Sequence, residues 1–194
     1  DIEKCEYIEK ILAENNIDVD ILINNAGIIC YENLEQVTRS QIQEVFNTNV
    51  ISTVLLSQMI MRRMEQQKKR GVIVNTLSFA ATIPSAGSGI YAASKAAMTS
   101  LTRTMAAEWA PKGIRVNGYS PGVIETEMTK PAIQNNGENM LDAIALHHFG
   151  KVDEMVKVVG FLASEDSEYI TGINLDASGG KYIVQNAGNA WKEK

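Results

Sequence analysis

Four short apolar runs alternate with longer helical patterns, and this alternation limits the possible fold more than any other feature. The runs cover residues 19–23, 72–77, 114–120 and 172–177. Each is too short to be a buried helix. The helical patterns cover residues 1–16, 39–69, 91–110 and 152–164. Because strands that alternate with helices are typical of βαβ units, we predict an α/β fold with a doubly wound parallel sheet.

The start of the first helix and the longest irregular segment can also be read from the sequence. The side chain of Asp1 can cap the first helix. Residues 125–149 are polar, contain methionines and show no period. A stretch of this length is predicted to be an irregular lid or binding loop, in which substrate identity is encoded.

The bulk composition excludes several classes of protein. The 194 residues suit one domain, and a net charge of -5 gives no electrostatic case for binding nucleic acid or an anionic membrane. No apolar run approaches the roughly 18 residues that cross a bilayer. Cys5 and Cys30 have neither the number nor the spacing of a disulfide framework or zinc site, and the adjacent His147 and His148 diverge. We therefore expect a cytoplasmic protein without a bound metal.

Tyr91 and Lys95 lie four residues apart in an alanine-rich helical run. This spacing places both side chains on one helix face. A cation about 4 to 6 Å from a phenol favours the phenolate, so we expect Lys95 to lower the pKa of Tyr91 and make it a general acid/base. Taken alone, the same pair is also typical of a solvated helix surface.

Small or polar residues follow three of the predicted strands. In an open parallel sheet, ligands bind beyond the carboxyl ends of the strands. The strand ends carry 24–27 (NNAG), Ser78 and 121–122 (PG). Ser78 precedes Tyr91 by thirteen residues and can reach back toward it, so its hydroxyl can hold a carbonyl oxygen that the phenol protonates.

Taken together, these motifs resemble the short-chain dehydrogenase/reductase family over residues 1 to about 182. The matching motifs, in order, are NNAG (24–27), FNTNV (46–50), the serine of VNTLS (78), YAASK (91–95), IRVN (114–117), SPGVIETEM (120–128) and YITG (169–172). Members similar to this chain include 3-oxoacyl-ACP reductases and sugar or polyol dehydrogenases.

The resemblance implies a catalytic tetrad and a cofactor site. The tetrad is Asn49, Ser78, Tyr91 and Lys95. Tyr91 exchanges the proton at the substrate oxygen, Ser78 positions that oxygen, Lys95 also binds the nicotinamide ribose, and Asn49 supports a water relay through its carbonyl. The implied contacts to NAD or NADP are Asn25, Ala26, Gly27, Tyr91, Lys95, Pro121, Gly122, Ile124 and Thr126.

Two departures from the family pattern bear on this prediction. The TGxxxGxG turn, which binds the pyrophosphate, does not occur after any strand of this sequence. We therefore expect residues 1–194 to be the C-terminal two-thirds to three-quarters of one Rossmann domain, with its first three strands missing and its first visible strand unpaired at one edge. Leu77 replaces a serine that is common before the Ser78 position.

The predicted function is NAD(P)-dependent interconversion of a ketone and a secondary alcohol. Two alternatives stay open: a catalytically silent scaffold or cofactor-binding protein with the same fold, and a non-redox lyase or epimerase that uses the same tyrosine. The partner is a small carbonyl or alcohol substrate. The resemblance also implies a homotetramer or homodimer.

Overall fold

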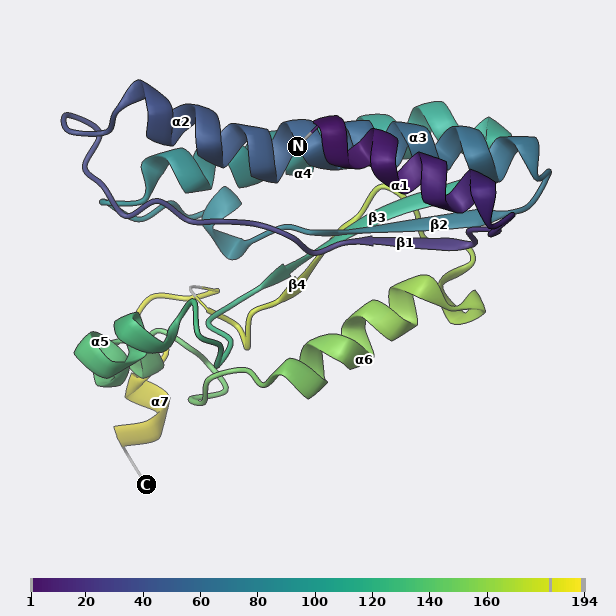
Figure 1. The fold of residues 1–194 in the computed structure, drawn as a ribbon. Helices are drawn as coiled ribbons and strands as arrows, with labels where there is room; N and C mark the ends of the chain where they lie inside the picture. Colours follow the sequence, from purple (N-terminus) through teal and green to yellow (C-terminus); the bar gives the residue numbers. More distant parts are fainter. Residues whose placement is uncertain (1, 182, 193–194) are drawn as a thin grey trace.

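The four apolar runs form one parallel sheet, as predicted. A computed structural model describes residues 2–181 and 183–192 and contains strands β1 (Ile21–Asn24), β2 (Gly71–Thr76), β3 (Ile114–Pro121) and β4 (Asn174–Ala177). Their order is β1-β2-β3-β4, and every neighbouring pair is parallel. The carboxyl ends of all four strands therefore lie together at one end of the sheet, on the left in Figure 1.

Helices cover both faces of this sheet, which confirms the predicted fold class (Figure 1). One face carries α1 (Ile2–Glu14), α2 (Arg39–Phe46), α3 (Ser52–Gln66) and α4 (Gly89–Trp109), and the other carries α6 (Val152–Ala163). The short helices α5 (Lys130–Asp142) and α7 (Asn189–Lys192) lie beyond the carboxyl end of β4. Asp1, the predicted cap of the first helix, lies outside the described residues.

The core forms two layers because successive side chains of β2 point to opposite faces. Ile73 packs with Met64 and Trp109 under the α1–α4 layer. Val74 packs with Leu162 of α6 on the other face. Full burial of an aliphatic side chain contributes roughly 1.5–3 kcal/mol, so these layers fix the sheet against both sets of helices.

The edge strand β1 is less well covered than the central strands. Ile21 is 47% exposed and Ile23 is 46% exposed. Within the described residues, β1 pairs only with β2. Its outer edge and part of one face are therefore open.

The predicted helix over residues 39–69 is interrupted by a π turn. Residues Asn47–Ile51 form this turn between α2 and α3, and the Ser52 amide donates to the Asn47 carbonyl. One extra residue per turn hardly disturbs an apolar helical pattern, so the sequence pattern did not reveal it. Such turns are frequent at functional sites, and this one contains Asn49.

The prediction that residues 125–149 are irregular throughout is wrong. Residues 130–142 form α5, with Pro131 in its first turn and a non-helical backbone at Asn136. Proline suits a helix start, whereas the Asn135-Asn136-Gly137 sequence interrupts the period. The segment is therefore a kinked helix between two irregular stretches.

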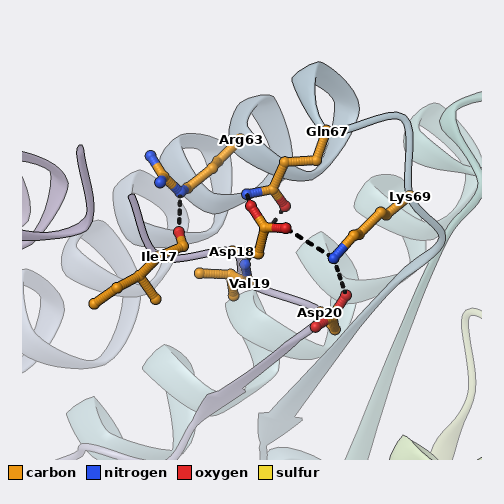
Figure 2. A network of polar contacts seen from close by, with 7 residues as sticks. All are labelled: Ile17, Asp18, Val19, Asp20, Arg63, Gln67 and Lys69. Carbon is orange, nitrogen blue, oxygen red and sulfur yellow. Dashed lines mark hydrogen bonds and ion pairs between the residues drawn. The ribbon is translucent and has the colours of Figure 1, made fainter. Parts of the chain in front are cut away.

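A polar network ties the α1–β1 connection to the end of α3 (Figure 2). The Nε of Arg63 donates to the Ile17 carbonyl at 2.8 Å, and its second terminal nitrogen donates to the Leu12 carbonyl at 2.9 Å. Gln67 donates to Asp18 at 2.8 Å, and Lys69 forms an ion pair with the same carboxylate. These contacts hold the segment that precedes β1 against the end of α3.

Arg63→Met is expected to lower the free energy of unfolding by about 1–2 kcal/mol. The reason is that the carbonyls of Leu12 and Ile17 each lose a charge-assisted donor. Urea unfolding measures the effect, with the exposed neighbour Arg62→Met as the matched control, expected within about 0.5 kcal/mol of the parent chain. Equal effects of the two substitutions would contradict this role for Arg63.

Candidate active site

A cleft of about 500 Å³ opens at the carboxyl ends of β1, β2 and β3. All nine residues predicted to contact the cofactor line it: Asn25, Ala26, Gly27, Tyr91, Lys95, Pro121, Gly122, Ile124 and Thr126. Ser78 lines it as well. A larger cleft of about 660 Å³ lies between α5 and the C-terminal segment, but it contains none of the predicted site residues. The first cleft is the better candidate because its polar groups converge at strand ends.

Lys95 is buried in the wall of the cleft and is held by a main-chain group. Its Nζ donates to the carbonyl of Thr76 at 2.8 Å and lies 5.8 Å from the centroid of the Tyr91 ring. Burial lowers the pKa of Lys95 to about 8. The ammonium is therefore mostly charged at neutral pH but loses its proton more readily than an exposed lysine.

The pKa of Tyr91 shifts in the direction opposite to the one predicted. Burial raises this pKa, a hydrogen bond with Ser78 acts against the shift, and the nearby Tyr31 adds to it. Lys95, whose ammonium donates to the Thr76 carbonyl, is not among the groups that lower this pKa. Tyr91 is consequently a protonated phenol at neutral pH, which suits a proton donor.

Ser78 is fixed by the turn that follows β2. It caps the short helix Phe79–Ala81, and its Oγ accepts a hydrogen bond from the Ala80 amide at 3.1 Å. A serine hydroxyl that accepts in this way still has its own proton to donate. That proton is available to the Tyr91 oxygen or to a substrate oxygen in the cleft.

Asn49 differs from the other three tetrad residues because it lies behind the cleft. Its Oδ1 accepts from the Ile28 amide at 2.8 Å, and its Nδ2 donates to the Ile28 carbonyl at 2.9 Å. A Cβ atom placed on Gly27 would lie 3.3 Å from Asn49 Oδ1 and 3.5 Å from Lys95 Nζ. Glycine at 27 therefore lets the main chain pass between these polar groups and the cleft.

Thr76 and Tyr119 contribute to the site although no sequence motif indicates them. Besides holding Lys95, Thr76 donates through Oγ1 to Asn25 Oδ1 at 3.0 Å and lies 3.2 Å from the Tyr119 hydroxyl. Thr76 and Tyr119 are register partners in β2 and β3. An alignment of the two predicted strand ends could have suggested this pairing. Other lining residues that were not predicted are Leu77, Val152 and Met155, whereas Met128 and Thr129 come from the predicted binding segment 125–149.

The unusual Leu77 is matched by a glycine on the neighbouring strand. A Cβ on Gly118 would lie 2.3 Å from Leu77 Cδ1 and 2.8 Å from its Cγ. Leu77 is 1% exposed, so its side chain has little freedom to move away. Leu77 therefore fills the space that a side chain at position 118 would occupy.

Gly118→Ala is expected to lower the free energy of unfolding by about 1–3 kcal/mol because it overpacks this buried contact. In a Leu77→Ala background, the same glycine substitution should cost at least about 1 kcal/mol less. A double-mutant cycle by urea unfolding measures the difference. Additive effects of the two substitutions would show that Leu77 is not the obstacle.

Comparison with known proteins now defines the family. The family model for "Enoyl-(Acyl carrier protein) reductase" matches residues 1–181. The chain is 36% identical to the 3-oxoacyl-[acyl-carrier-protein] reductase FabG of Vibrio cholerae over 182 residues, which is 94% of this chain and 74% of that protein. The corresponding Escherichia coli reductase is 37% identical over 177 residues, covering 91% and 72%. The chain belongs to the short-chain dehydrogenase/reductase family.

Solved structures agree with the family assignment. A 4-hydroxyisoleucine dehydrogenase complexed with NADH superposes with a TM-score of 0.91 at 30% identity, covering 95% of this chain and 77% of that chain. A structure from Agrobacterium tumefaciens with bound NADP gives 0.84 at 29% identity, covering 87% and 70%. The predicted family and the predicted enzyme class, an oxidoreductase acting on CH–OH groups, are thereby confirmed.

Among residues 2–181 and 183–192, no three His, Cys, Asp or Glu side chains gather in a group that could hold a metal ion. In the same part of the chain, no helix combines the length and apolar character needed to cross a membrane.

Proposed function

We propose that this chain interconverts a ketone and a secondary alcohol with NAD or NADP, and that Tyr91 moves the proton. The observation that supports this most strongly is the convergence of Ser78, Tyr91 and Lys95 on one cleft at the strand ends. These are the groups that carbonyl reduction needs: a proton donor, a hydroxyl that positions the oxygen and a cation near the cofactor.

The residues of the cleft suit the nicotinamide end of a dinucleotide. Asn25, Ala26 and Gly27 form one wall, and Pro121 and Gly122 form another. At Gly122 a Cβ would come within 2.7 Å of the Ser178 carbonyl oxygen, so only glycine fits this turn. Lys95 would bind the ribose, while Ile124 and Thr126 would enclose the nicotinamide. When bound, the cofactor supplies or accepts the hydride at the carbonyl carbon.

The protonation state of Tyr91 determines in which direction it moves the proton. In the reducing direction, the protonated Tyr91 donates its phenolic proton to the carbonyl oxygen, and Ser78 donates a hydrogen bond to the same oxygen. A new C–H bond and a new O–H bond replace the C=O π bond. In the oxidising direction Tyr91 must be a phenolate, so this direction is favoured at higher pH because burial raises the pKa of Tyr91.

Lys95 supports the tyrosine in two ways. Its ammonium, 5.8 Å from the centroid of the Tyr91 ring, places an opposite charge beside the phenolate that remains after proton donation. Its pKa of about 8 also lets it supply a proton to Tyr91. We assign Asn49 to this relay, through the main-chain carbonyl of its π turn.

We propose that residues 1–194 are the C-terminal two-thirds to three-quarters of one Rossmann domain, and the open edge of β1 supports this. We also propose a homotetramer or homodimer in the cytoplasm. Light scattering tests the assembly, and a monomer at all concentrations would contradict it.

A cofactor-consumption assay tests the proposed function. The purified protein is given NADH or NADPH with a panel of ketones that includes 3-oxoacyl thioesters and keto sugars. We expect alcohol to accumulate as the reduced cofactor disappears, in equal amounts. Product without net cofactor loss would indicate a lyase or epimerase instead. Tight dinucleotide binding without any turnover would indicate a silent member of the family.

A further inference from the structure

Ser94 lies between Tyr91 and Lys95 in the sequence and is completely buried in α4. Its hydroxyl donates to the Tyr91 carbonyl at 2.7 Å and accepts from Asn49 Nδ2 at 3.0 Å. We propose that Ser94 is a positioning residue that fixes the Asn49 carboxamide and couples the π turn to the helical turn that carries Tyr91. This inference deepens the proposed function and rests on it.

The single proton of the Ser94 hydroxyl sets the direction of the chain of hydrogen bonds. The short contact to the Tyr91 carbonyl uses that proton, because a carbonyl can only accept. Toward Asn49 the serine oxygen is therefore an acceptor. Only the NH₂ group of Asn49 can face it, so Ser94 selects one of the two orientations of this amide.

The same orientation is required on the other side of Asn49. Its Oδ1 accepts from the Ile28 amide and its Nδ2 donates to the Ile28 carbonyl. A flipped carboxamide would place NH₂ against the Ile28 N–H and two oxygens against each other at the carbonyl. With Ser94 in place, both Nδ2 protons are used, and the amide is locked by three hydrogen bonds.

The orientation of the Asn49 carboxamide affects the cleft through Gly27. Asn49 Oδ1 and Lys95 Nζ both approach the position that a side chain at 27 would occupy. A carboxamide that shifts or turns would change the dipole near the Lys95 ammonium, and it would displace Ile28 and with it Gly27, which lines the cleft. Ser94 thus acts on the reaction through Asn49 and touches neither substrate nor cofactor.

The test compares Ser94→Ala with Thr99→Val in the complete protein. Both substitutions remove a hydroxyl of α4 that donates to a carbonyl of the same helix, since Thr99 donates to the Lys95 carbonyl at 2.9 Å. Ser94→Ala is expected to speed hydrogen exchange of the Ile28 amide about tenfold or more and to lower kcat about 10- to 100-fold. The KM for the ketone should change less than about twofold. Thr99→Val should leave the Ile28 exchange rate and kcat within about twofold of the parent.

The two readouts separate this inference from the proposed function. Unchanged exchange at Ile28 in Ser94→Ala, or a kcat equal to that of Thr99→Val, would overturn the role of Ser94. If the parent protein reduces no ketone, the proposed function fails, and the exchange rate of the Ile28 amide alone decides whether Ser94 fixes Asn49.

Discussion

Tyr91→Phe is expected to lower kcat for ketone reduction by about 10²- to 10⁴-fold, because the substrate oxygen loses its proton donor while the ring still fills the same space. The assay follows oxidation of the reduced cofactor with a ketone that the parent enzyme accepts. KM should change little, since the phenolic proton is needed mainly in the transition state.

A matched control is available at Tyr169, whose side chain is fully exposed. Tyr169→Phe also removes a single hydroxyl and is expected to keep kcat within about twofold of the parent. Turnover of Tyr91→Phe at the parent rate would show that another group moves the proton.

Lys95→Met is expected to abolish turnover and, at pH 7, to raise the free energy of unfolding by about 1–3 kcal/mol. Burial lowers the pKa of Lys95 to about 8, from the ordinary value of 10.5. Folding therefore opposes the charged form, and a neutral methionine of similar length removes that cost. Loss of the hydrogen bond to the Thr76 carbonyl offsets part of the gain.

The gain in stability from Lys95→Met is expected to decrease as the pH rises. Below pH 8 the lysine is charged in both states, so the cost of burying the charge is present in full. Between pH 8 and 10.5 the unfolded chain binds more protons than the folded chain, so the stability of the parent rises with pH. Urea unfolding at pH 7 and pH 10 should show that the stability advantage of Lys95→Met over the parent is smaller at pH 10.

The exposed Lys157→Met is the control, expected to differ from the parent equally at both pH values. An advantage that stays constant, or a less stable Lys95→Met at pH 7, would contradict the burial argument.

The order of strands and helices was predictable because the spacing of apolar residues in each segment indicates which of its side chains are buried. Ile73 and Val74 lie in a run that only a strand covered on both faces can bury. Residues that follow such strands, such as Gly27, Ser78 and Gly122, are placed at one edge by the parallel order alone. The candidate site was therefore located by the same reasoning as the sheet.

The chemistry within the site depends on contacts that local patterns do not encode. Spacing placed Lys95 near Tyr91, but its ammonium is directed to Thr76, a residue of another element. The raised pKa of Tyr91 follows from burial, which requires the packed structure. Likewise, nothing in the alanine-rich sequence around Ser94 indicates its contact with Asn49 in the π turn 45 positions earlier.

The most direct test of the account follows the hydrogen atom itself. The protein is given a ketone and a reduced nicotinamide cofactor that carries deuterium at the transferable position, and the alcohol is examined by mass spectrometry and NMR. The account predicts one deuterium per alcohol, bound to the former carbonyl carbon, while the hydroxyl proton comes from the protein and solvent. Alcohol without deuterium at that carbon, or deuterium retained on the cofactor after product forms, would contradict it.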